Sequence, residues 1–144
     1  MANETLLKFN YPESLICEYQ NWVVLLRPKQ VTAGSLILAC KLDATKMSEV
    51  PAEAFAELSR VTTDLEGVLS GLFAYEKINY LLLMMADKHV HFHVLPRYSG
   101  TREVCGVTFS DTSLPKPPDL SKVTDITTAQ YKDILETIKR IWPS

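Results

Sequence analysis

Three histidines alternate with apolar residues in one short stretch, His89-Val90-His91-Phe92-His93-Val94-Leu95. They are the only 3 histidines among the 144 residues of the chain. Successive side chains of a β-strand point to opposite faces. A strand here would project all three imidazoles from one face and place the valines and Phe92 on the other. The pattern therefore predicts a strand with the three imidazoles on one face and apolar core residues on the other.

The chemistry that suits this arrangement is nucleophilic catalysis by an imidazole. The unperturbed pKa of histidine lies nearer neutrality than that of any other side chain. Same-face neighbours on a strand stand about 6.5 to 7 Å apart, so the central ring, His91, can attack a centre that His89 and His93 contact. We interpret His91 as a nucleophile that replaces one hard displacement by two easier ones.

Three alternatives are compatible with the same residues. A zinc site would need two of the histidines and a ligand from elsewhere, since His89 and His93 lie about 13 Å apart along a strand. A solvated strand face that carries histidines is the second alternative. A nucleic-acid patch is the third, and it fits less well because the formal net charge is -2, whereas such sites use a basic excess.

The stretch from His89 to Leu95 resembles the signature of the histidine triad superfamily, His-φ-His-φ-His-φ-φ with φ apolar, at every position. The following Pro96-Arg97 is similar to the fragile histidine triad branch and to bacterial dinucleoside-polyphosphate hydrolases. The resemblance implies a small α+β domain, usually a homodimer, that binds a nucleotide and attacks its α-phosphate. It assigns the covalent nucleotidyl intermediate to His91, and phosphate contacts and leaving-group protonation to His89 and His93. It implies no cofactor, and a divalent ion on the substrate phosphates is compatible with it.

Two segments depart from the family pattern. Members of the family carry a glycine-rich, Gln-containing loop before the triad, where this chain has only Met85 to Lys88. We interpret Lys88 as a substitute phosphate contact, because an ammonium can serve as a point charge for phosphate. An exposed turn lysine is the alternative.

The second departure lies in the segment from Leu26 to Ser35. Ala33-Gly34-Ser35 replaces the family's Pro-Gly-His, and Arg27 stands where an acidic or amide residue contacts the ribose in the family. Arg27 is a candidate for a bidentate phosphate contact, and Arg97, directly after the triad, is another. For both, a solvated surface arginine is the alternative.

The elements that must position these residues follow from hydrophobic periodicity. Short apolar stretches predict antiparallel strands over Leu15 to Tyr19, Trp22 to Leu26 and Ser35 to Lys41, with a turn at 28–34. Lys77 to Met85 is apolar on both faces, which predicts a central strand. Ala86 to Lys88 would then join it to the triad strand as a hairpin.

Two helices are predicted. The first begins at Pro51 and carries an apolar stripe made of Phe55, Leu58, Thr62, Leu65, Leu69 and Leu72. The second begins with a capping box, Thr127-x-x-Gln130, with Ile126 and Tyr131 placed for a hydrophobic staple. Its stripe consists of Ile134, Leu135, Ile138, Ile141 and Trp142.

This order of elements predicts an α+β fold with a five-stranded antiparallel sheet and two main helices on one face. We expect residues 1–144 to form a single domain like that of the histidine triad proteins. Residues 1–14 would be an irregular N-terminal arm or lid. Residues 99–125 would be an irregular loop region, interrupted by a short strand at Glu103 to Phe109.

Composition narrows the class of protein further. The chain is 47% hydrophobic and 22% charged, which is ordinary for a globular domain. Its three cysteines lack metal-ligand spacing, its N-terminus lacks a signal-peptide plan, and its apolar runs are too short for a membrane span. We therefore expect a cytoplasmic protein with a nucleotide substrate and no nucleic-acid or membrane partner.

The function expected is hydrolysis at the α-phosphate of dinucleoside polyphosphates or related nucleotide conjugates. A nucleotidyltransferase or phosphorylase is an alternative, because phosphate can replace water as the second acceptor. A nucleotide-binding regulatory module with little turnover is the other. A nucleotidyl adduct on a histidine would distinguish an enzyme from a binding module.

Overall fold

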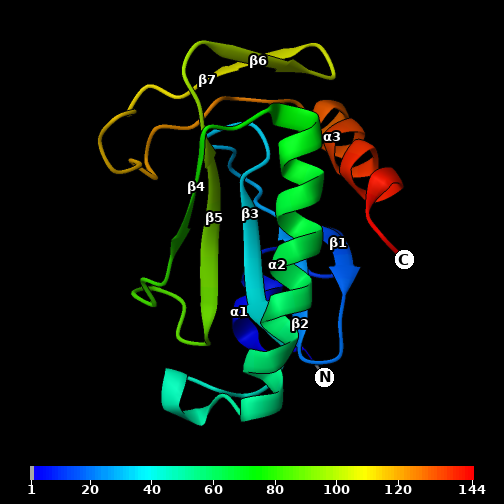
Figure 1. Cartoon of the computed structure of the whole chain (residues 1–144), viewed down its shortest axis with the longest axis vertical. Helices are drawn as coiled ribbons and strands as arrows, with labels where there is room; N and C mark the ends of the chain where they lie inside the picture. Colours follow the sequence, from blue (N-terminus) through cyan, green and yellow to red (C-terminus); the bar gives the residue numbers. More distant parts are fainter. Residues whose placement is uncertain (1) are drawn as a thin grey trace.

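The computed structural model describes residues 2–144 and contains one five-stranded antiparallel sheet, in the order β1-β2-β3-β5-β4 (Figure 1). Its strands are β1 (Leu15–Glu18), β2 (Trp22–Leu26), β3 (Leu36–Cys40), β4 (Lys77–Leu81) and β5 (His91–Arg97). The predicted α+β class and antiparallel five-stranded sheet are confirmed. The triad strand β5 lies between β3 and β4, so both of its edges are hydrogen-bonded.

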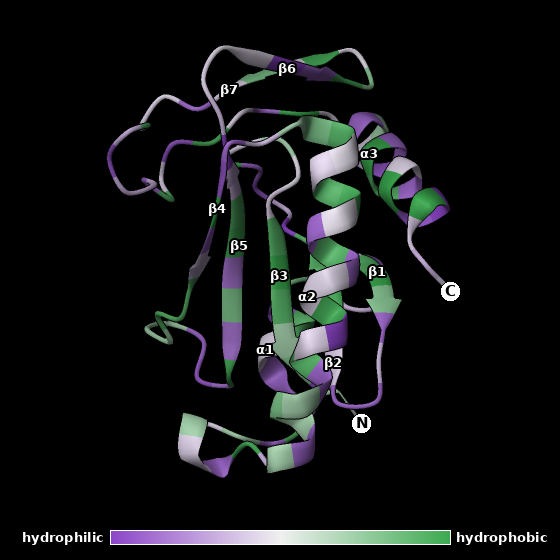
Figure 2. Cartoon of the chain, in the orientation of Figure 1, coloured by the Kyte–Doolittle hydropathy of each residue, from purple (hydrophilic) through white to green (hydrophobic). Residues whose placement is uncertain are grey.

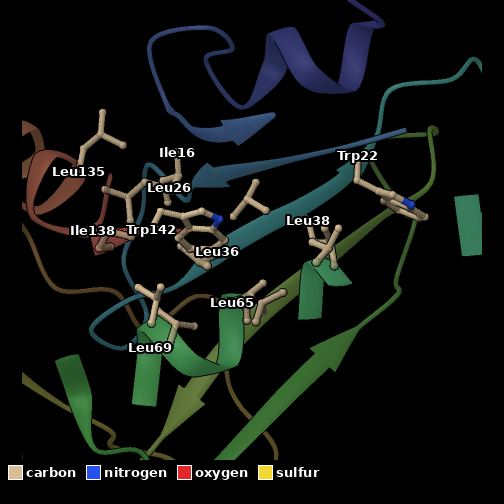
Figure 3. Packing of buried hydrophobic residues seen from close by; sticks show 14 of the residues in the cluster. Ile16, Trp22, Leu26, Leu36, Leu38, Leu65, Leu69, Leu135, Ile138 and Trp142 are labelled. Atoms are coloured by element: carbon tan, nitrogen blue, oxygen red, sulfur yellow. The ribbon is translucent and has the colours of Figure 1, made fainter. Parts of the chain in front are cut away.

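Two long helices cover one face of the sheet, and a short helix covers the other. α2 (Ala52–Phe73) and α3 (Thr128–Ile141) share a core with β2 and β3, and Figure 3 shows Leu65 and Leu69 of α2 packed near Leu36 of β3. α1 (Glu4–Lys8) lies on the opposite face, behind the sheet in Figure 1. The predicted irregular arm therefore contains a helix.

The buried stripe of α2 is rotated from the predicted one. Leu65 and Leu69 are buried as expected, but Phe55 is exposed, and Val61 and Phe73 are buried instead. The sheet and α3 together decide which side of the helix is buried, and periodicity within the helix does not contain that information.

The start of α3 agrees with its sequence signal. Thr127 Oγ1 accepts a hydrogen bond from the Gln130 N–H at 3.1 Å, and Gln130 Oε1 accepts one from the Thr127 N–H at 2.9 Å. This is the predicted capping box. Ile134 and Ile138 are buried, whereas Ile141 is exposed because the helix ends beside solvent there.

The prediction for β4 was wrong in its length and its place. The strand ends at Leu81 and lies at the edge of the sheet rather than at its centre. Met84 has a left-handed backbone, with φ of 52°, which is incompatible with continued extension. The connection to β5 therefore spans residues 82–90, and we call it the pre-triad loop.

Residues 99–125 contain more regular structure than expected. β6 (Thr101–Val104) and β7 (Val107–Ser110) form a separate two-stranded hairpin, where one short strand was predicted. A single 3-10 turn, η1 (Met47–Glu49), precedes α2. No helix among residues 2–144 is both long and apolar enough to cross a membrane.

Candidate active site

The sheet brings two of the three histidines onto one face of β5. His91 pairs with Ala39 and His93 pairs with Ile37 of β3, so both rings point to the face that α1 covers. β5 begins at His91, which corrects the prediction of one strand through the whole motif. His89 lies in a bend just before the strand. The alternating polar and apolar bands of β5 are visible in Figure 2.

His91 is held in a defined tautomer by its own backbone. Its Nδ1 lies 2.7 Å from the carbonyl oxygen of His89. A carbonyl can only accept a hydrogen bond, so Nδ1 carries the proton. In the neutral ring Nε2 then keeps its lone pair, which is the state a nucleophilic imidazole needs.

His89 is fixed by two side chains from distant parts of the sequence. Its Nδ1 lies 3.1 Å from Thr5 Oγ1, and that hydroxyl also accepts a hydrogen bond from the His89 backbone N–H. Its Nε2 lies 2.7 Å from Asp43 Oδ1. A carboxylate accepts from an N–H, so Nε2 of His89 carries a proton and Asp43 fixes the orientation of the ring.

His93 differs from the other two because one of its ring nitrogens has no partner. Nδ1 is buried and makes no hydrogen bond. Burial, together with the nearby charges of Arg27 and His91, lowers the pKa of His93 to about 4. His93 is therefore neutral at pH 7. Its ring centroid lies 5.2 Å from that of His91.

The N-terminal segment, residues 2–13, covers the triad. The ring of Phe9 lies 5.6 Å from that of His91 and 6.0 Å from that of His93 between centroids. His89, His91 and His93 are only 3%, 2% and 8% exposed. Two ion pairs join the N-terminal segment to the pre-triad loop, Lys8 to Asp87 at 3.5 Å and Lys88 to Glu4 at 3.7 Å.

Lys88 lies at the open end of the site. Its ammonium is largely exposed, and it borders a pocket of about 440 Å³ that reaches His89. The other residues that line this pocket are Ala2, Asn3, Glu4, Lys41 and Asp43. Lys88 therefore lies at the edge of this pocket, where its ammonium is paired with Glu4, and its contact with a phosphate stays a prediction.

Arg27 is buried on the triad face, contrary to the alternative of a solvated arginine. It follows β2, and its backbone N–H bonds to the carbonyl of Ser35. Gln30 shapes this turn: its Nε2 donates to the carbonyls of Arg27 and Ser35, and its Oε1 accepts from the N–H groups of Gly34 and Ser35.

Arg97 is not brought together with the triad. It ends β5, about 20 Å along the strand from His91. Its guanidinium donates to Asp111 at 2.7 Å, to Asn79 Oδ1 and to the carbonyl of Lys116. Both members of the Arg97–Asp111 pair are buried. This geometry gives Arg97 a structural role in anchoring residues 111–116, and the site proposed below omits it.

Sequence reasoning missed four residues that shape the site: Thr5, Phe9, Asp43 and Gln30. Thr5 and Phe9 belong to a segment without sustained periodicity, and Asp43 lies in a bend after β3. An amide side chain in a turn rich in glycine and proline could have indicated Gln30, because such turns need local acceptors and donors. Within residues 2–144, no group of three or more His, Cys, Asp or Glu side chains is placed to hold a metal ion.

Comparison with known proteins places the fold. No protein-family model matches the chain, and no curated protein matches it. A histidine triad protein from Bradyrhizobium japonicum superposes with a TM-score of 0.75 at 16% identity, over 99% of this chain and 98% of that one. A histidine triad protein from Sinorhizobium meliloti superposes with a TM-score of 0.74 at 20% identity, over 97% of this chain and 95% of that one.

A third structure, the Plasmodium falciparum diadenosine triphosphate hydrolase, gives a TM-score of 0.62 at 10% identity, over 90% of this chain and 76% of that one. The chain therefore has the fold of the histidine triad proteins. The predicted resemblance to that superfamily is confirmed at the level of fold.

Proposed function

We propose that this protein is a histidine triad nucleotide hydrolase that works through a covalent nucleotidyl intermediate on His91. The observation that carries the proposal is the hydrogen bond from His91 Nδ1–H to the His89 carbonyl, which leaves Nε2 as the free nucleophile. The substrates are dinucleoside polyphosphates or related conjugates with a leaving group on the α-phosphate.

In the first step, His91 Nε2 attacks the α-phosphorus in line with the leaving group. A P–N bond forms, and the bond from phosphorus to the leaving group breaks. Charge on the equatorial oxygens requires nearby cations or donors. Lys88 and Arg27 supply positive charge at opposite ends of the triad.

The leaving group needs a proton in this step. His93 is a poor source, because burial first, and then the charge of Arg27, lowers its pKa to about 4. His89 is the alternative, because its Nε2 lies 2.7 Å from the Asp43 carboxylate, which accepts a hydrogen bond from an N–H and so fixes the orientation of this ring. We assign the general-acid role to His89 and substrate contact to His93.

In the second step, water attacks the phosphorus, the P–N bond breaks and a nucleoside monophosphate leaves. The proton from water returns to the triad, which restores the starting state. If inorganic phosphate replaces water, the same intermediate gives a nucleoside diphosphate, so a phosphorylase or nucleotidyltransferase uses the same residues.

The burial of the triad favours a second candidate function. His91 is only 2% exposed, so substrate reaches Nε2 only after residues 2–13 move. A protein in which that movement is rare would bind nucleotide with little turnover and act as a regulatory module. The partners that we propose in either case are a nucleotide and, as the sequence resemblance implies, a second copy of the chain.

The test is chromatographic. Purified protein is incubated with diadenosine tetraphosphate and with adenosine phosphoramidate, with and without a chelator, and release of AMP is followed. We expect AMP from the wild type and none from His91→Ala. The chelator arm shows whether a divalent ion on the substrate is needed.

Intact mass after rapid acid quench should show one nucleotidyl group, located in the peptide that contains residues 89–93. Nucleotide binding without AMP or adduct would contradict the hydrolase and favour the binding module. Absence of both binding and turnover would contradict the proposed function altogether.

A further inference from the structure

The buried polar atoms that lack a partner are gathered in one part of the molecule. Within residues 2–144, three buried side-chain atoms make no hydrogen bond: Arg27 Nε, Thr32 Oγ1 and His93 Nδ1. Buried polar groups are normally satisfied, so each exception needs an explanation. Arg27 and Thr32 belong to the turn between β2 and β3, and His93 lies on β5, which is next to β3.

Arg27 carries a buried charge without a counter-ion. It is 9% exposed, no carboxylate of the described chain pairs with it, and its guanidinium donates only to the carbonyl of Lys29. A buried cation is costly unless an anion compensates it. The arrangement is therefore suited to an anion that comes from outside the chain.

Register places Arg27 and His93 on the same face. Leu25 pairs with Ile37, and Ile37 pairs with His93, so these three side chains form one row across the sheet. Arg27 is two residues beyond Leu25 and continues the pairing through Ser35. It thus stands one row further along the face. The positive charge of Arg27 also contributes to the lowered pKa of His93.

We propose that Arg27 and His93 form a phosphate subsite beside His91, which selects nucleotide substrates that carry a second phosphate. The Arg27 guanidinium would donate from Nε and a terminal nitrogen to two phosphate oxygens, the bidentate mode that arginine favours. The unpartnered nitrogen of His93 offers a further polar contact.

This subsite rests on the proposed function, because it assumes that the reacting phosphate lies at His91. Two sources supply the same chemistry: the next phosphate of a polyphosphate chain, or a phosphate on the sugar of a nucleoside bisphosphate. In either case a conjugate with a single phosphate, such as adenosine phosphoramidate, binds more weakly than one with two phosphates.

Binding without turnover tests the subsite. In a His91→Ala background, calorimetry compares AMP, ADP and adenosine 3′,5′-bisphosphate. We expect ADP or the bisphosphate to bind at least about tenfold more tightly than AMP, as one charge-assisted contact gives. Tighter binding of ADP would show that the subsite holds the next phosphate of a polyphosphate. Tighter binding of the bisphosphate would show that it holds a phosphate on the sugar.

Substitution of Arg27 separates the subsite from the reacting centre. Arg27→Met should remove the preference, so that ADP and the bisphosphate bind with affinities within about twofold of that of AMP, while Arg27→Lys should keep part of it because it keeps the charge. Equal affinities of the three ligands for the parent protein, or a preference that survives Arg27→Met, would overturn the subsite.

Thermal melting distinguishes a ligand site from a structural arginine. Pyrophosphate should raise the Tm of the wild type and not that of Arg27→Met. In phosphate-free buffer Arg27→Met should melt at or above the wild-type Tm, because it removes an uncompensated buried charge. A lower Tm with an unchanged pyrophosphate shift contradicts the subsite. A pyrophosphate shift without any nucleotide binding would instead contradict the proposed function and support the subsite.

Discussion

At the scale of single residues, the site combines three histidines in three different environments. His91 donates to a carbonyl, His89 lies between a hydroxyl and a carboxylate, and His93 has a nitrogen without a partner. Identical side chains at regular spacing therefore have separate roles, because the groups that surround each ring differ.

The low pKa of His93 has a consequence for stability. Its folded pKa of about 4 lies below the ordinary value of 6.5, so the unfolded chain binds more protons between these values. The free energy of unfolding should therefore be constant above pH 6.5 and fall as the pH drops below it. Urea unfolding at pH 7.5, 5.5 and 4.5 measures the decline.

His93→Asn removes this titration, so its unfolding free energy should vary less between pH 6.5 and 4.5 than that of the wild type. Carboxylates with lowered pKa, such as Glu18, also lose stability as the pH falls toward their ordinary value of 4.5, but they do so equally in the two proteins, so the difference between the profiles reports His93. Parallel pH profiles for the two proteins would contradict the assignment.

Gly34 is the second residue with a measurable role, because it lets the Arg27 turn approach α2. Its φ is +84°, and a Cβ there would lie 2.5 Å from Phe73 Cε2. Gly34→Ala should cost about 1 to 3 kcal/mol of unfolding free energy. Gly67→Ala is the matched control, since a Cβ at Gly67 meets nothing within 4 Å and alanine favours a helix. Similar effects at the two glycines would contradict this role.

At the scale of elements, the N-terminal segment decides whether the triad can be reached. Leu6 anchors α1 in the small core on that face of the sheet, and Phe9 lies against two of the imidazoles. α2 and α3, by contrast, pack only on the other face. Access to the nucleophile is thus controlled by a short helix and not by the main core.

Phe9→Ala should increase the rate at which diethyl pyrocarbonate modifies the triad, by several-fold, because it uncovers His91 and His93. The reaction is followed by ultraviolet difference absorbance, and the chain's only histidines are those of the triad. Phe55→Ala is the control, because Phe55 is an exposed phenylalanine of α2. Equal rates in both variants would show that residues 2–13 do not limit access.

At the scale of the whole molecule, the sheet has an open edge at β4. An unpaired strand edge is a template for another chain unless it is covered. The pre-triad loop next to it exposes Leu83 and Met85, the latter by 88%. We expect a homodimer that covers this edge.

Sedimentation at low protein concentration should give twice the mass of the chain, and Met85→Glu should shift the protein toward a monomer. Ile141→Glu introduces the same charge at another exposed apolar residue, at the end of α3, and should leave the mass unchanged. A wild type that sediments as a monomer contradicts the homodimer.

Much of this architecture was predictable because its causes are local. The alternation of His91, Phe92 and His93 follows from the pleat of a strand, and the start of α3 follows from hydrogen bonds between Thr127 and Gln130 three residues apart. The strands β1 to β3 were placed to within about a residue for the same reason. β4 was not, because its end depends on a left-handed residue in a loop that no periodicity marks.

The amino-acid sequence alone determined the triad, the order of the five sheet strands and two long helices, and the α+β class, since each depends on neighbours along the chain. Only the tertiary structure decided that Thr5 holds His89 across 84 residues, that Arg97 pairs with Asp111, and that Arg27 is buried without a counter-ion. Burial and charge pairing are properties of three-dimensional neighbours. Two arginines that look equivalent in the sequence therefore have different roles in the folded protein.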